Sequence, residues 1–276
     1  MKKIMALIAC FVVILFYTSA YAGSIFISGH DPIWHSNFGG NTAGATNLAT
    51  TGIEYSRNGS ALPFLFVESY DAVPSGNAYE APFLISNLGY AATDFVKADI
   101  SVLNSFTDFR SELNNYSAIV VASDHGGMLS ADELQFLNNH SGDIISYLNA
   151  GGGLTAFAES NATGLIGAVQ PFGFLPFLVS STSFQVFESG NVVTPFGASL
   201  GLTNADVNGN FSHNYFTSTG GMTPVDLYNG NTAMPLSLAF RGQIGTGGVA
   251  VPEPSTLLLL GSGILGLGFV RRRLKG

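Results

Sequence analysis

The sequence predicts a single α/β domain in which helices cover both faces of a mainly parallel β-sheet, giving three layers. Residues 117–123 (SAIVVAS) are a short run rich in β-branched apolar residues, which is typical of a strand buried on both faces. Residues 130–150 have the apolar spacing of an amphipathic helix, and residues 154–160 (LTAFAES) follow as a second strand. Strand, helix and strand at this spacing predict a βαβ unit with parallel strands and a right-handed crossover.

The helix predicted over residues 130–150 has recognisable ends. Ser130 can cap its N-terminus, and Glu133 stands three residues later, as in a capping box. The glycines at 151–153 are expected to end the helix. Gly142 is a position at which it can break into two pieces.

The flanking segments extend this pattern in both directions. The Gly-, Ala- and Thr-rich residues 37–52 suggest a loop leading into a weak helix, and residues 81–88 suggest the start of another. The apolar segment 171–179 contains Pro171 and Pro176, which argue against a central strand there. The further expected strands are residues 24–28, 62–68 and 95–100 before the βαβ unit, and 184–187, 224–228 and 235–240 after it.

The two ends of the chain differ in composition from its middle. Residues 1–22 begin with two lysines, continue as an apolar run and end in Ala20-Tyr21-Ala22, the pattern of a secretory signal peptide cleaved after Ala22. An uncleaved anchor helix is the alternative. The sequence therefore predicts a signal peptide at 1–22, a globular domain at 23–250 and a separate tail at 251–276.

The globular part is acidic and lacks cysteine. The whole chain has a formal net charge of −8, and residues 23–250 carry four basic residues against 17 acidic ones, a net charge of −13. Nucleic acids and anionic lipids require clustered Lys and Arg, so this charge argues against both as partners. The single cysteine, Cys10, lies in the signal segment, which excludes disulfides, a cysteine nucleophile and thiolate metal ligands from the mature domain.

Residues 115–160 resemble the central part of class I glutamine amidotransferase-like domains, and residues 212–216, 224–228 and 235–240 resemble the tail of such domains. The resemblance implies a flavodoxin-like, mainly parallel fold. In those enzymes a cysteine at a strand-to-helix elbow is the nucleophile. This sequence has no cysteine there and no G-x-S-x-G elbow, so the resemblance supports the fold and counts against the reaction. No catalytic residue is assigned, and a non-catalytic protein is favoured.

Histidine, aspartate or glutamate follows four of the predicted strands. Ligands of parallel α/β sheets bind beyond the carboxyl ends of the strands, where these side chains would meet. Imidazole with carboxylate suits zinc, manganese or iron, whereas carboxylate alone suits calcium or magnesium, so a divalent metal is the one candidate cofactor. The candidate metal ligands are His30, Asp31, His35, Asp124, His125 and Glu159, with Glu68 and His213 as further candidates.

A structural role for the same residues is the alternative. Asp31 and Asp124 would then cap helices or turns, and His30 and His125 would be hydrogen-bonded in loops. Glu159 alone could act as a general base, although a carboxylate in this position is more often a cap or an ion-pair partner.

The tail resembles the C-terminal sorting signal of PEP-CTERM proteins. Pro252-Glu253-Pro254, an apolar segment at 256–270 and Arg271, Arg272 and Arg273 follow one another in the order of that signal. In that family the tail holds the exported chain in the inner membrane until an exosortase recognises the PEP region and removes it. The resemblance implies that Pro252, Glu253 and Pro254 are the recognition residues here.

The length of the apolar segment agrees with temporary anchoring. Its 15 residues span only ~22 Å as a helix, short of the ~30 Å hydrocarbon core, so a permanent membrane anchor is the less favoured alternative. The three arginines fix the cytoplasmic side of this short transmembrane helix.

Together these features predict an exported exosortase substrate that is tethered transiently to the inner membrane. Its destination would be the envelope or the exopolysaccharide matrix of a biofilm, where it would be a non-catalytic structural or binding component with exopolysaccharide as a partner. The alternative is an extracytoplasmic metal-dependent hydrolase that uses the strand-end His, Asp and Glu residues.

Overall fold

The computed structural model describes residues 23–69, 80–125, 128–161, 164, 166–175, 179–245 and 250–251. The expected signal helix and membrane helix both lie outside these residues. Within the described ranges, no helix combines the length and the apolar character needed to cross a membrane. In chain order the elements are β1 (Gly23–Ser28), α2 (Pro32–His35), α3 (Thr42–Arg57), β2 (Phe64–Val67), α4 (Ala81–Ser86), β3 (Phe95–Ala98), α5 (Ile100–Ser105), α6 (Phe109–Leu113), β4 (Ala118–Val121), α7 (Ala131–Asn139), α8 (Ser141–Asn149), β5 (Gly153–Ala156), β6 (Ser180–Phe187), β7 (Val192–Val193), α9 (Pro195–Ser199), β8 (Phe211–Ser218), β9 (Thr223–Leu227), a 3₁₀ turn (Tyr228–Gly230), β10 (Pro235–Ile244) and β11 (Ala250–Val251).

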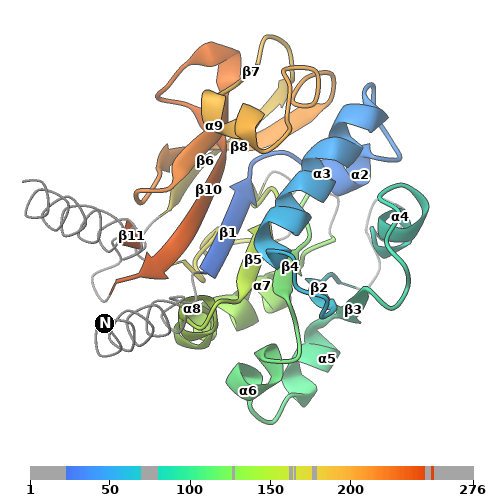
Figure 1. The fold of residues 1–276 in the computed structure, drawn as a ribbon, viewed down its shortest axis with the longest axis vertical. Coiled ribbons are helices and arrows are strands. Elements are labelled where there is room, and N and C mark those ends of the chain that lie inside the picture. The colour runs from blue at the N-terminus through green and yellow to red at the C-terminus, as the bar shows by residue number, and fades with distance from the viewer. Residues whose placement is uncertain are drawn as a thin grey trace, which may run out of the picture.

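One large mixed sheet organises the domain (Figure 1). Its strands lie in the order β3-β2-β4-β5-β1-β10-β9-β7, with β11 beside β10. The strands from β3 to β1 pair in parallel. In contrast, β10 pairs antiparallel with β1 and β9, and β7 pairs antiparallel with β9. A separate antiparallel pair is formed by β6 and β8.

The prediction of a mainly parallel sheet is wrong, because the C-terminal strands join it as antiparallel neighbours. β9 ends at Leu227 and β10 begins at Pro235, whereas a parallel crossover needs about a dozen residues or more. Both strands were predicted, and the short segment between them already favours an antiparallel pair. The α/β class and the single domain are confirmed, and the flavodoxin-like arrangement is not shown.

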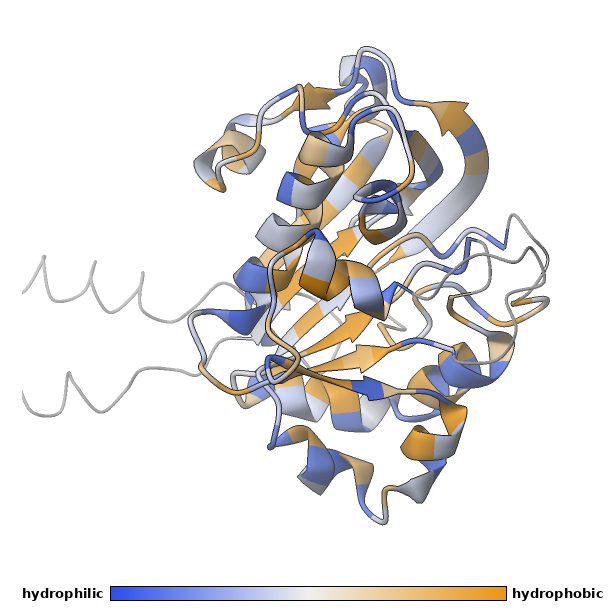
Figure 2. Ribbon diagram, turned by 90° about the vertical axis from the view of Figure 1, so that its right-hand side faces the viewer, coloured by the Kyte–Doolittle hydropathy of each residue, from blue (hydrophilic) through white to orange (hydrophobic). Residues whose placement is uncertain are grey.

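Helices cover both faces of the parallel half of the sheet, and apolar residues fill the strands between them (Figure 2). Val121 of β4 packs in one apolar cluster with Leu148 of α8. Its neighbour Val120 packs in a second cluster with Ile53 of α3 on the opposite face. Successive strand residues point to opposite faces, so burial of both faces explains why these strands are continuous apolar runs.

The helix predicted over 130–150 is present as two helices, α7 and α8. The Ser130 N–H donates to the Glu133 carboxylate at 2.8 Å, and the predicted capping box is confirmed. The break falls at His140 rather than at Gly142. Gly151 follows the end of α8 with φ of 102°, a left-handed conformation that favours glycine.

The end of β1 is the place where the smaller sheet meets the large one. The backbone N–H of His213, in β8, donates to the Gly29 carbonyl at 2.8 Å. A Cβ atom at residue 29 would lie 1.8 Å from the backbone oxygen of Asn214, so this close approach requires glycine. The contact brings the inward side chains of β8 to the carboxyl ends of the parallel strands.

Replacing Gly29 with alanine is expected to lower the free energy of unfolding by about 2 kcal/mol, because an overpacked site forces the backbone apart. Gly142→Ala, in α8, is the matched control, since no atom apart from its chain neighbours and the nearby backbone of its own helix lies within 4 Å of the added Cβ. That control is expected to stabilise the protein by up to ~1 kcal/mol through helix propensity. Urea unfolding followed by circular dichroism measures both changes, and equal stabilities for the two variants would contradict the tight contact at Gly29.

Candidate metal centre

Asp31, His35 and His213 converge beyond the carboxyl end of β1. Each offers one ligand atom, and the three atoms lie within 4.8 Å of one another. The three residues are buried, with exposed fractions of 1%, 8% and 2%. Both carboxylate oxygens of Asp31 and the Nε2 atoms of both histidines lack a hydrogen-bond partner. Polar atoms buried in this way are costly unless a ligand satisfies them, so the group has the character of a binding site.

The short helix α2 presents Asp31 and His35 together. The two residues are four positions apart, which places them on one face of a helical turn. Asp31 occupies the N-cap position, but its side chain makes no capping hydrogen bond. Asp31 therefore makes no well-aligned capping bond, although the Trp34 N–H lies near its carboxylate.

A hydrogen bond orients each histidine of the group. The Nδ1 atom of His35 lies 2.7 Å from the carbonyl oxygen of Phe38, and the Nδ1 atom of His213 lies 2.9 Å from Oε1 of Gln185. These oxygens can only accept, so each Nδ1 carries a hydrogen, and the Nε2 atom of the neutral ring is the one left to bind a cation. Histidines that bind metals are commonly held in this way by a second partner.

The electrostatics of the group also suit a cation. Burial, together with the neighbouring charges of His125, His35 and His30, lowers the pKa of His213 to about 2, so its ring is neutral at physiological pH. Burial raises the pKa of Asp31 to about 6, even though the charge of His35 opposes the shift. A bound cation would favour the ionised form of this carboxylate.

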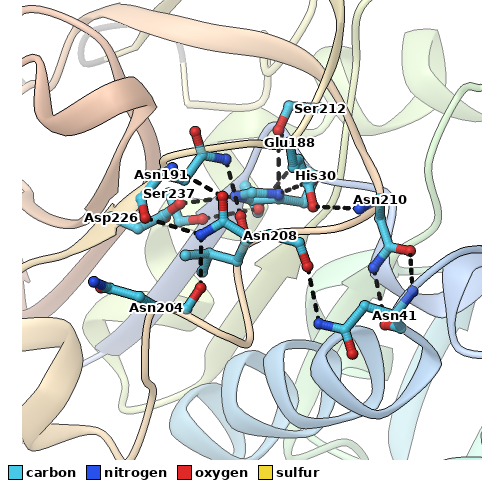
Figure 3. Close-up of polar contacts among 12 residues, drawn as sticks. His30, Asn41, Glu188, Asn191, Asn204, Asn208, Asn210, Ser212, Asp226 and Ser237 are labelled. Atoms are coloured by element: carbon cyan, nitrogen blue, oxygen red, sulfur yellow. Dashed lines mark hydrogen bonds and ion pairs between the residues drawn. The ribbon is translucent and has the colours of Figure 1, made fainter.

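His30 belongs to a different polar cluster (Figure 3). Its Nδ1 lies 2.5 Å from Glu188 and its Nε2 lies 2.9 Å from Asp226. Burial alone would lower the pKa of His30, but these two carboxylates outweigh it and raise the pKa to about 10. The ring is therefore a buried cation with both nitrogens occupied. The structure places His30 outside the group of free ligand atoms.

Asparagine side chains fasten this cluster to α3 (Figure 3). Asn41, the N-cap of α3, accepts from the Gly44 N–H at 3.0 Å through its side chain. Its backbone pairs twice with the Asn210 side chain, at 3.1 and 2.9 Å. The Asn210 N–H in turn donates to Glu188 at 3.2 Å. These bonds position the carboxylate that faces His30.

Asp124 has a structural role in a neighbouring loop. Its carboxylate accepts from the backbone N–H groups of Ser160 at 2.9 Å and Asn161 at 2.6 Å. This matches the turn-anchoring alternative that the sequence left open. Burial, partly offset by these bonds, raises the pKa of Asp124 to about 6.

His125 and Glu159 lie near the group without completing it. The ring of His125 stacks on that of His213, with 3.9 Å between centroids. Glu159 accepts a hydrogen bond from the Phe172 N–H through one oxygen, and its other oxygen is unpartnered. Among the described residues, no fourth His, Cys, Asp or Glu joins the close group of Asp31, His35 and His213.

Sequence reasoning did not single out Glu80, Glu188 or Asp226. Glu188 directly follows β6, so the strand-end rule applied to 184–187 would have found it. Asp226 is a charged residue inside the apolar run 224–228, and a buried charge in a strand requires a partner. Glu80 precedes α4 and carries no signal of this kind in its own segment.

Comparison with known proteins identifies the tail. Residues 250–273 match the family model of the PEP-CTERM protein-sorting motif. Such signals are recognised by exosortase, so the chain is an exported, membrane-processed protein that exosortase sorts. The match includes Pro252, Glu253, Pro254, Arg271, Arg272 and Arg273, which lie outside the described residues.

The comparisons do not extend to the folded domain. No curated protein matches the chain. The resemblance of residues 115–160 to amidotransferase-like domains is not supported by these findings. What the domain does must therefore be argued from its own geometry.

His30→Ala is expected to lower the free energy of unfolding by about 3–5 kcal/mol, because it leaves Glu188 and Asp226 buried without their cation. His140→Ala is the control, since its pair with Asp143 is about one-third exposed and should contribute ~1 kcal/mol or less. Urea unfolding in the presence of a chelator measures both variants. Equal losses would show that the His30 cluster does not stabilise the fold.

Proposed function

We propose that exosortase-dependent sorting delivers this domain to the cell envelope, where it binds a divalent transition-metal ion through Asp31, His35 and His213. The PEP-CTERM motif supports the route. The observation that carries the metal is the set of buried, unpartnered ligand atoms, whose histidines already have their Nδ1 atoms occupied.

The ligand set favours zinc and also accepts manganese or iron. Two imidazole nitrogens and one carboxylate oxygen are common ligands of these ions. Three protein ligands leave at least one coordination position for water. A cavity of about 10 Å³, lined in part by Asp31 and His35, has room for about one water molecule.

Among the described residues, the cavity that touches Asp31 and His35 is small. Sites for organic ligands commonly have volumes of ~300–1,000 Å³, far above the 10 Å³ beside Asp31. We therefore favour a non-catalytic component of the envelope or of an exopolysaccharide matrix, with the inner membrane as a temporary tether. The metal would stabilise the junction between α2 and β8.

A metal-dependent hydrolase is the second candidate. Its support is the open coordination position, together with two buried carboxyl groups near the centre. Burial raises the pKa of Asp124 to about 6, so this group could exchange a proton near neutral pH, and burial raises the pKa of Glu159 well above its usual range. Zinc-dependent hydrolysis of a generic phosphate or carboxylate ester, abolished by His213→Ala, would favour this candidate.

The proposal predicts that Zn²⁺ binds tightly and that its affinity depends on the histidines of the group. His35→Ala and His213→Ala should each weaken the tightest Zn²⁺ site by about 100-fold or more, since each removes a ligand. His140→Ala should leave the affinity unchanged. Isothermal titration calorimetry of the purified chain measures this, and an absent Zn²⁺ site or equal affinity in all variants would refute the proposal.

Gln185 provides a second test, because it orients His213 without touching the ion. Gln185→Leu should weaken Zn²⁺ binding by about 10–100-fold, the usual effect of losing an outer partner. Gln135→Leu, on the exposed face of α7, is the matched control. The same calorimetric titration applies, and indistinguishable affinities would show that the Gln185 contact does not prepare the ring for a metal.

A further inference from the structure

Glu80 lies against the candidate metal centre on its Asp31 side. The residue is fully buried, and the oxygens of its carboxylate make no well-aligned hydrogen bond with an N–H or hydroxyl group. The carboxyl groups of Glu80 and Asp31 lie within hydrogen-bonding reach of each other and can share a proton when no cation is bound. The Trp34 backbone amide also lies near both carboxyl groups and favours their charged forms.

The position of Glu80 is fixed by its own backbone. The carboxylate of Glu68, at the end of β2, accepts hydrogen bonds from the N–H groups of Glu80 and Ala81. The start of α4 is thereby tied to the strand ends, with the Glu80 side chain directed at Asp31. The backbone hydrogen bonds to Glu68 therefore hold the Glu80 carboxyl group next to that of Asp31.

No lysine or arginine is paired with these two carboxyl groups in the described residues, although a positive charge on His35 would favour ionised Asp31. Among the described residues, none of the ion pairs includes Asp31 or Glu80. Burial, and then the charges of Asp31 and Glu68, raise the pKa of Glu80 well above its usual range. Two buried carboxyl groups that face each other repel when both are ionised, so they need either a shared proton or a bound cation.

Glu80 does not fit as a ligand of the same ion as the histidines. Asp31, His35 and His213 form a group within 4.8 Å, and Glu80 does not join it. Asp31 has two carboxylate oxygens, so one can serve the histidine side and the other can serve the Glu80 side once the proton shared with Glu80 is displaced.

We propose that Asp31 bridges two cations: the transition metal held with His35 and His213, and a second divalent cation held between Asp31 and Glu80. This inference rests on the proposed metal-binding function. A site made of carboxylate oxygens suits Mn²⁺, Mg²⁺ or Ca²⁺, whereas the histidine site suits Zn²⁺. Paired ions that share a bridging ligand lie ~3.5–4 Å apart and are a common device for hydrolysis, so occupancy of both sites would favour the hydrolase candidate.

Mn²⁺ added to the Zn²⁺-loaded chain tests the second site. Electron paramagnetic resonance measures free Mn²⁺, because the sharp signal of the aqueous ion is lost on binding. The wild type is expected to bind one Mn²⁺ per chain, and Glu80→Gln to weaken that binding at least tenfold while keeping one Zn²⁺. Glu112→Gln, a half-buried carboxylate on α6, is the matched control and should behave as the wild type.

The outcomes separate the two proposals. One tight Zn²⁺ without bound Mn²⁺ in the wild type overturns the second site and leaves the histidine site intact. Mn²⁺ binding that Glu80→Gln does not weaken overturns it as well. Absence of both ions refutes the proposed function itself. Folding is not the weak point of the test, because the amide in Glu80→Gln can donate a hydrogen bond to Asp31 and should raise the metal-free stability.

Discussion

The hydrogen bond from the His213 N–H to the Gly29 carbonyl is the contact on which the candidate centre depends. It holds β8 against the end of β1, although the two residues are far apart in sequence. The side chain of His213 thereby reaches Asp31 and His35, and Ser212 pairs with His30. Gly29 has no side chain, and this permits the close approach of the two backbones. The candidate metal centre therefore depends on this backbone contact.

Two sets of buried ionisable side chains lie side by side after β1. One set contains its own counter-charge and stabilises the fold, whereas the other does not and is the candidate binding site. His30 is a cation between Glu188 and Asp226, so that cluster contains its own counter-charge. Asp31 and Glu80 meet without a lysine or arginine in any ion pair of the described residues, so a shared proton or a bound cation must relieve their repulsion. A satisfied ion-pair cluster stabilises a fold, whereas an unsatisfied group of metal-type ligands calls for a partner from outside.

The sequence predicts the central βαβ unit, the capping box at Ser130 and Glu133, and the position of most strands, because these depend on local periodicity and capping. It also places Asp31 and His35 at a strand end. It does not predict the antiparallel half of the sheet or the approach of β8. The group that results, with His213 as its third member, depends on contacts between residues about 180 positions apart. Nothing near His30 in the sequence distinguishes its ion-pair role from the ligand role predicted for it.

The sorting tail and the folded domain give independent information. The tail assigns the chain to exosortase-dependent export, and the domain carries a centre whose ligand atoms are ready for a metal. Anomalous diffraction at the zinc absorption edge, from crystals of the zinc-loaded chain, tests that centre most directly. The account predicts a peak ~2.0–2.2 Å from Nε2 of His35, Nε2 of His213 and a carboxylate oxygen of Asp31. A map without a peak at this position would contradict it.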